Sequence, residues 1–190
     1  MPSLMIHLLT AYKYSQNMSI SFKIGNVAPD VTEGKEAKDK THFRDRIDDR
    51  LYCLTEYAKS KNIKDEYVLG TLLHLYTDFL WDEEAILPYK EKKGEDWFLP
   101  YRSETSKASS FICHTYPWGK SVWEEMFEAF DDPSLYFEGE DMKRLGEFVK
   151  KNGTWHLQND IGPSEVYTPD CVEHFCESTA KKFKKWIKNI

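Results

Sequence analysis

The chain lacks the features of secreted, disulfide-stabilised and membrane-spanning proteins. Its four cysteines, at positions 53, 113, 171 and 176, form no CxxC pair, and no disulfide framework is evident, so we expect free thiols. No apolar run approaches the length of a membrane span, and the first twelve residues carry neither a basic segment nor a small-residue cleavage site. These absences predict a cytoplasmic protein without a membrane anchor.

The chain also has fewer positively charged residues than negatively charged ones. The chain has 26 Lys and Arg against 32 Asp and Glu, which gives a formal net charge of -6. An overall field of this sign argues against strong binding to nucleic acid or to anionic lipid. A small phosphate substrate stays compatible with it, because a bound metal ion can reverse the local sign.

No repeat and no Gly, Pro and Ser-rich linker divides the chain, so residues 1–190 are expected to form one domain. Apolar residues recur at helical spacing, which predicts an all-α bundle of several helices. The expected helices cover 4–14, 41–57, 65–81, 103–116, 118–130 and 140–151, and a last one starts at 168. Pro88 should stop the third helix. Residues 19–24 are the best strand candidate, and glycines and prolines predict irregular structure from there to residue 40.

The most informative segment is YVLGTLLHLYTDFLW, residues 67–81, which contains no Lys, Arg or Glu. A helix with an ordinary solvent-exposed face would carry such residues, so this helix should be mostly buried. His74 and Asp78 are four residues apart, which places their side chains about 5–6 Å apart on one face. They are close enough to share a metal ion, or to bond each other within the core.

Three further residues favour the metal interpretation. His7 lies in the apolar first helix, Asp30 follows a proline in a loop with glycines, and His42 stands next to the expected helix cap at Thr41. Imidazoles and carboxylates are the ligands that catalytic zinc sites use. The hypothesis is a buried metal site made of His7, Asp30, His42, His74 and Asp78.

The order and type of these residues resemble the zinc-dependent phospholipase C family, whose all-α fold is shared with a group of zinc-dependent nucleases. The resemblance lies in SLMIHLL around His7, GNVAPD ending at Asp30, KTHF around His42, and LGTLLHLYTDFLW, and it covers roughly the first 80 residues. It implies that Asp30, His42, His74 and Asp78 bind one zinc ion. It further implies that His7 binds a neighbouring zinc ion, which Asp78 bridges to the first.

The chain departs from the family pattern in three places. Secreted members use their processed terminal residue as a ligand, whereas here only removal of Met1 would expose a new terminus, at Pro2. Glu84 stands where the family has the first histidine of a further zinc site. Residues from about 85 onward match nothing in the lipid-cleaving members. One to three Zn²⁺ ions are therefore compatible with the sequence, and two are expected.

Other candidate residues keep two interpretations. His114, and the pair His156 and Asp160, could join the site or be structural, and His174 should lie on the surface. Cysteines 171 and 176 have helical spacing and are expected in the core rather than on a metal. The cations around His42 could hold substrate phosphate or belong to a solvated stretch; they are Lys35, Lys38, Lys40, Arg44 and Arg46.

The function that follows is a metal-dependent phosphoric ester hydrolase resembling phospholipase C, acting on a small phosphate ester or a phospholipid. Metal-bound water would lose its proton near neutral pH and attack the phosphate, and Asp30 or Asp78 would accept that proton. Two alternatives stay open: a nuclease or nucleotide phosphatase of the same fold, and a non-catalytic helical module with a structural metal.

Overall fold

The computed structural model describes residues 2–190, and none of these residues lies in a β-strand, which confirms the all-α prediction. In chain order the α-helices are α1 (Leu4–Tyr14), α2 (Ile20–Val27), α3 (Lys35–Thr41), α4 (Arg50–Lys59), α5 (Glu66–Trp81), α6 (Leu87–Lys93), α7 (Phe98–Thr115), α8 (Ser121–Phe130), α9 (Met142–Gln158) and α10 (Pro169–Ile187). Within the described part of the chain, none of the helices has both the length and the apolar character that crossing a bilayer requires.

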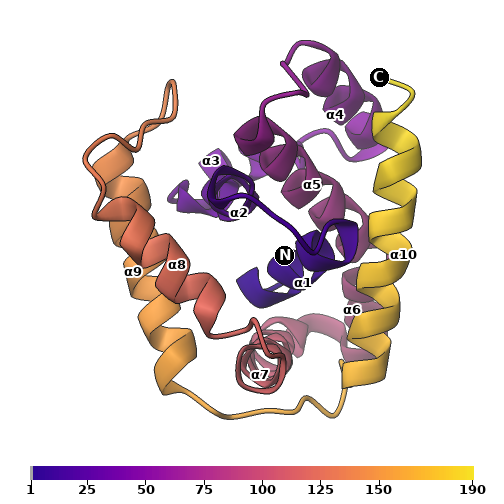
Figure 1. The fold of residues 1–190 in the computed structure, drawn as a ribbon. Helices are drawn as coiled ribbons and strands as arrows, with labels where there is room; N and C mark the ends of the chain where they lie inside the picture. Colours follow the sequence, from indigo (N-terminus) through magenta and orange to yellow (C-terminus); the bar gives the residue numbers. More distant parts are fainter. Residues whose placement is uncertain (1) are drawn as a thin grey trace.

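Helix α1 lies in the middle of the molecule. Figure 1 shows it surrounded by other helices, and it packs against α2, α5, α7 and α10. Every residue from Leu4 to Ala11 is buried. A helix that is apolar on all sides can only be stable in such a position, where neighbours cover each face. Because His7 lies in the middle of this helix, its imidazole is placed in the core.

Helices α2 and α5 approach each other unusually closely, and two glycines make this possible. A Cβ added to Gly25 would lie 2.1 Å from the Tyr67 carbonyl oxygen, and one added to Gly70 would lie 2.2 Å from that of Phe22. The close approach brings the end of α2 within hydrogen-bonding distance of α5, where Asn26 Nδ2 donates to Gly70 O at 3.2 Å. The expectation that Gly25 ends regular structure was wrong, because here glycine serves helix packing.

The strand expected at residues 19–24 is helical. Ser19 Oγ accepts a hydrogen bond from Phe22 N at 3.2 Å and caps α2, which begins at Ile20. The alternating pattern of SISFKI fits a strand, but an isolated strand has no partner to satisfy its backbone groups. Packing of Phe22 and Ile24 into the core therefore decides in favour of a helix.

The helix expected over residues 41–57 begins only at Arg50. Thr41 is the last residue of α3, and α4 begins at Arg50. Between them Phe43 has a φ of 54°, a left-handed conformation that no continuous helix contains. The turn buries His42 directly after α3, with only 1% of its surface exposed.

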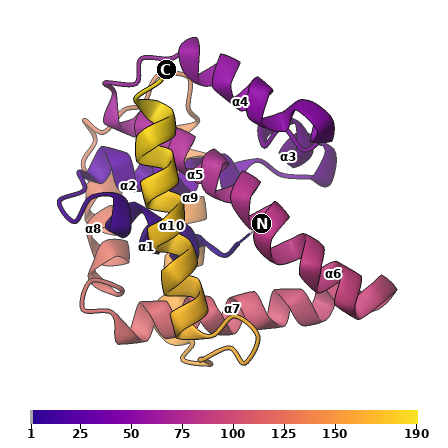
Figure 2. The ribbon, with the colours of Figure 1, turned by 90° about the vertical axis from the view of Figure 1, so that its right-hand side faces the viewer.

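Helix α5 ends at Trp81, but Pro88 does not stop the helical structure that follows it. A π-helical turn (Asp82–Ile86) links it to α6, and Figure 2 shows the resulting long diagonal rod. The turn interrupts the regular hydrogen-bond pattern, so Pro88 falls in the first turn of α6, where its missing donor costs little. The expected cap at Asp65 is confirmed, because its carboxylate accepts from Tyr67 N at 2.8 Å.

The later helices follow the expected order with shifted ends. Helix α7 starts at Phe98 rather than near residue 103, and α9 continues to Gln158 rather than ending near 151. His156 is thus on a long helix that continues through Gly153. The start of α10 at a Thr168 cap, with Pro169 in its first turn, is confirmed.

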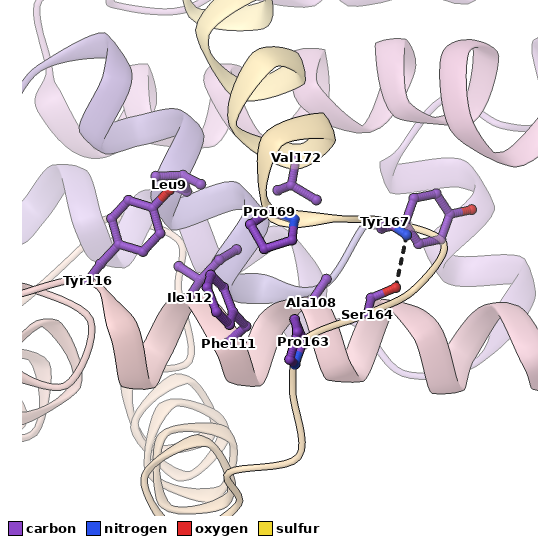
Figure 3. Close-up of a pocket in the computed structure, with 10 residues that line it drawn as sticks. All are labelled: Leu9, Ala108, Phe111, Ile112, Tyr116, Pro163, Ser164, Tyr167, Pro169 and Val172. Carbon is purple, nitrogen blue, oxygen red and sulfur yellow. Dashed lines mark hydrogen bonds between the residues drawn. The ribbon is translucent and has the colours of Figure 1, made fainter.

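The segment between α9 and α10 crosses beneath α7 and is held there by one carboxylate. Glu104 Oε2 accepts from Ser164 Oγ at 2.6 Å and from the backbone nitrogens of Glu165 and Val166 at 3.1 and 3.3 Å. Figure 3 shows a pocket beside this segment, lined largely by apolar side chains such as Leu9 and Val172. Its volume of about 10 Å³ has room for no more than one water molecule, so it is a packing gap and not a substrate site.

Candidate metal centre

The five residues named from the sequence meet in the core. His7, His74 and Asp78 are fully buried, and His42 and Asp30 are 1% and 8% exposed. They come from four separate segments: α1, the 3₁₀ turn after α2, the residue after α3, and two successive turns of α5. The fold thus brings together side chains that are up to 71 positions apart in the chain, from 7 to 78.

The side chains form two overlapping groups, each compact enough for one metal ion. His42, His74 and Asp78 make the first group, and His7, Asp30 and His74 make the second; within each, the donor atoms lie within 4.8 Å of one another. In the first group His42 Nε2 is 3.2 Å from Asp78 Oδ2 and 3.3 Å from His74 Nε2. His74 Nε2 is 3.6 Å from the same Asp78 oxygen.

Backbone carbonyls orient two of the imidazoles. His74 Nδ1 lies 2.8 Å from Asn26 O at the end of α2, and His42 Nδ1 lies 2.9 Å from Lys38 O. A carbonyl oxygen can only accept, so each Nδ1 carries a hydrogen, which leaves Nε2 as the nitrogen that can bind a metal ion. This arrangement, with one ring nitrogen held and the other free, is the one that metal-binding histidines have.

His7 and Asp78 keep polar atoms without hydrogen bonds. Among the described residues, neither ring nitrogen of His7 and neither carboxylate oxygen of Asp78 has a hydrogen-bond partner, although all four atoms are buried. His7 Nε2 approaches Asp78 Oδ1 to 3.5 Å, and its ring stacks on His74 with centroids 3.8 Å apart. Buried polar atoms that make no hydrogen bond are rare in folded proteins and need an explanation. A metal ion bound by these atoms would supply one, so the residues present fit the expected group.

The protonation of the cluster also suits a cation. Burial lowers the pKa of His7 and of His42 to about 4, so both are neutral ligands at neutral pH. Burial opposes the charge on Asp78 as well, but the Arg44 guanidinium and the surrounding imidazoles outweigh it and hold the pKa of this carboxyl well below its usual range. Burial opposes a proton on His74, yet the Asp78 and Asp30 carboxylates raise its pKa. Two buried carboxylates thus draw positive charge into the site.

Two arginines behind the cluster form a network with Asp82, and of these three residues only Arg44 was named from the sequence. Arg44 lies 3.3 Å from Asp78 Oδ2 and donates through Nε to Asp82 Oδ2 at 2.6 Å. Arg50 donates to the same Asp82 oxygen at 2.8 Å and to the His42 carbonyl at 2.9 Å. Asp82 follows Asp78 by one helical turn, and this spacing was the signal that could have identified it.

The remaining cations near His42 divide into two kinds. Lys38 Nζ lies 3.2 Å from Asp30 Oδ1 and so reaches the cluster, as Arg44 does. Lys40 instead pairs with Glu36 on the surface of α3. Arg46 pairs with Asp49 away from the site, and Lys35 is exposed.

A cleft opens next to Asp30. It lies between α7 and α9, has a volume of about 490 Å³, and is lined by Asp30, Lys38 and the segment 2–4 together with one side of each of the two helices. We call it the α7–α9 cleft. None of its α7 and α9 residues except His156 was singled out from the sequence.

A second cleft, of about 850 Å³, adjoins the first at Lys38 and Arg102. Its wall combines nine charged residues with seven apolar or aromatic ones, and several of the apolar side chains are exposed: Ile47 is 82% exposed, Phe98 54% and Leu87 53%. Arg44, which touches Asp78, also lines it. We call it the apolar cleft.

The other candidates named from the sequence lie outside the cluster. His156 Nε2 is 2.8 Å from Ser109 Oγ, and the Nε2 of His114 is 3.0 Å from the His156 carbonyl oxygen. Asp160 is an exposed residue 3.9 Å from His114 Nδ1. Glu84 accepts a hydrogen bond from Lys182 of α10 at 2.6 Å.

Cysteines 171 and 176 stand apart from the cluster as well. Cys176 is buried against α1, where its Sγ donates to Ile6 O at 3.6 Å, whereas Cys171 is exposed, contrary to the expectation that both lie in the core. All four cysteines are free thiols in the structure, as predicted. His174 lies on the surface, also as predicted.

Comparison with known proteins adds no relative: no family model, no curated protein and no solved structure matches the chain.

Proposed function

We propose that this protein is a divalent-metal-dependent hydrolase of phosphoric esters, with zinc as its metal and two ions as the expected number. His42, His74, Asp78 and Asp30 would hold one ion, and His7 with Asp78 the other. The single observation that carries the proposal is the set of buried polar atoms on His7 and Asp78 that make no hydrogen bond, beside two histidines whose Nδ1 atoms are held by carbonyls. Structural cores seldom leave so many polar atoms unsatisfied.

The α7–α9 cleft favours an enzyme over a structural metal site. A closed coordination sphere is typical of structural zinc, whereas a catalytic site keeps a position that substrate can reach. Asp30 belongs to the cluster and also lines the cleft, so a molecule in the cleft would lie next to the metal ligands.

A divalent ion held by these residues would lower the pKa of bound water and withdraw charge from a phosphoryl oxygen. The chain itself contributes ligands, a proton acceptor and cations. Asp30 Oδ1 contacts Lys38 and His42, which leaves Oδ2 to accept the proton of the attacking water. Lys38 and Arg44 supply positive charge on either side of the carboxylates for the phosphoryl oxygens.

The apolar cleft supports the likeness to phospholipase C more than the nuclease alternative. Its wall includes Phe79, Leu87 and Phe98, and it meets the α7–α9 cleft at two cations. A substrate with an apolar portion would place that portion in the apolar cleft and its phosphate near the metal ligands, as an ester of a lipid would.

The test is hydrolysis by protein stripped with a chelator and then reloaded with zinc. We expect turnover of at least one class among phosphodiesters, phosphomonoesters and phospholipids, loss of that turnover on chelation, and recovery with metal. Asp30→Asn should lower kcat at least about a hundredfold, as loss of a general base does. Metal-loaded protein that is stabilised by its metal but turns over none of these substrates would establish the structural module instead.

A further inference from the structure

The α7–α9 cleft has a charge that contrasts with the chain as a whole. The protein carries a net charge of -6, yet the cleft is lined by three cations, Lys38, Arg102 and Lys151, and by one carboxylate, Asp30. Asp30 already has Lys38 at 3.2 Å and would be further neutralised by metal. The wall facing a bound molecule is therefore positive.

Two of the three cations have no partner of their own. Within residues 2–190, neither the Arg102 guanidinium nor the Lys151 ammonium makes a hydrogen bond or an ion pair. Other cations on the same helix pair with acids, as Lys107 of α7 does with Glu104 at 2.7 Å. Unpaired cations on two facing helices give the cleft charged hydrogen-bond donors that are available to bind an anion.

Helical spacing places both cations on the faces that form the cleft. On α7 Arg102 precedes Ser106 by four residues, and on α9 Lys151 precedes Trp155 by four, and all four line the cleft. The two helices are tied together by the contact between Ser109 and His156 at 2.8 Å. Ser3, at the N-terminal edge of the cleft, has a buried hydroxyl without a hydrogen-bond partner.

The size of the cleft argues against a single phosphate as its occupant. A volume of about 490 Å³ falls in the range that holds organic ligands. Trp155, 38% exposed, and Phe148 offer apolar surface in the same wall. A molecule filling the cleft would thus have a phosphate by the metal ligands, an organic portion against these rings, and negative charge near Arg102 and Lys151.

We propose that Arg102 and Lys151 form an anion subsite, so that the substrate carries a second anionic group besides the phosphate that is hydrolysed. This proposal rests on the proposed function and specifies its substrate class. It also implies discrimination: an ester whose second group is a cation, such as a quaternary ammonium, would meet like charge in this cleft.

The test uses two non-hydrolysable probes, phenylphosphonate and 4-carboxyphenylphosphonate, titrated calorimetrically into metal-loaded protein. We expect the carboxylated probe to bind about tenfold more tightly, and this preference to shrink as salt is raised. The double variant Arg102→Ala/Lys151→Ala should bind both probes equally. The control is Lys92→Ala/Lys150→Ala, which removes the same charge from exposed residues outside the cleft and should keep the preference.

Equal affinities in the unaltered protein, or binding of neither probe, would overturn the anion subsite. A preference that survives in Arg102→Ala/Lys151→Ala would also overturn it. So would a control variant that loses the preference as fully as Arg102→Ala/Lys151→Ala does. The outcome is separable from the proposed function: hydrolysis of esters without any carboxylate preference refutes the subsite alone, whereas a preference without hydrolysis supports the subsite and refutes the enzyme.

Discussion

Replacing Asp78 by asparagine should lower the stability of the metal-free protein and also weaken metal binding. The two effects can be measured separately. Asp78 belongs to the first ligand group, touches His7 of the second, and contacts Arg44 at 3.3 Å. Asparagine keeps the size of the side chain and removes its charge. The variant therefore tests the charge of this residue and leaves the packing around it unchanged.

The metal-free protein should lose about 3 kcal/mol of unfolding free energy. Breaking a buried ion pair costs about 3–5 kcal/mol because the partner charge is left uncompensated. The lower end applies here, because Arg44 keeps Asp82 as a partner at 2.6 Å. Zinc at about a thousand times its Kd should add about 4 kcal/mol to the natural protein. A hundredfold loss of affinity in the variant would remove about 2.7 kcal/mol of that gain.

The assay is denaturant unfolding of both proteins with and without zinc, together with elemental analysis of the bound metal. Asp82→Asn is the matched control: it breaks contacts with Arg44 and Arg50 one helical turn away from the ligand residue. The control should lose stability but keep the zinc increment. If Asp78→Asn shows the same zinc increment and metal content as the natural protein, Asp78 is an ordinary buried carboxylate and the reasoning fails.

Three further predictions follow from particular contacts. Gly70→Ala should lower the unfolding free energy by about 2–3 kcal/mol, because its Cβ would lie 2.2 Å from the Phe22 carbonyl oxygen; an unchanged thermal midpoint would refute the close packing of α2 and α5. Asp30→Asn should reduce kcat far more than it reduces stability, and equal effects on unfolding and on turnover would argue against a catalytic role. Burial opposes ionisation of Glu104, but hydrogen bonds from Lys107, Ser164 and the loop outweigh it and lower its pKa to about 2. Its folded pKa is lowered, so its contribution is present above the unfolded pKa of about 4.5 and lost as pH falls toward 2. Glu104→Gln should therefore cost about 1–2 kcal/mol at pH 7, discounted for solvent screening, and the difference from the natural protein should vanish near pH 2; a difference that does not change with pH would contradict this.

The grouping of the five buried polar residues could be predicted from the sequence because its signals are local. An HxxxD pair on a helix without Lys, Arg or Glu indicates a buried polar site wherever that helix packs. The residues His7, Asp30 and His42 were added on their type and order, and the fold brings them to the same place. The all-α class followed from apolar spacing, which depends only on neighbours in the chain.

The connections around the site could not be predicted, because tertiary contacts decide them. Residues 19–24 alternate like a strand and become a helix through packing against α5, where glycines 25 and 70 permit the close approach. The left-handed turn at Phe43 separates α3 from α4 against a continuous helical pattern. The Phe43 ring packs on the half-buried Tyr57, fourteen positions further on, with ring centroids 5.6 Å apart.

The cleft residues were missed for a related reason. Arg102 and Lys151 lie among other polar residues of their helices, and such positions usually face solvent. Only the juxtaposition of α7 and α9 beside Asp30 makes them one wall. No periodicity within either helix contains that information.

The measurement that tests the central claim most directly is anomalous diffraction at the zinc edge from crystals of the zinc-loaded protein, with elemental analysis of the same sample. The account predicts one anomalous peak within about 2 Å of His42 Nε2, His74 Nε2 and an Asp78 oxygen, and a second peak beside His7. Zinc found only elsewhere, or a cluster that remains empty in protein saturated with zinc, would contradict it.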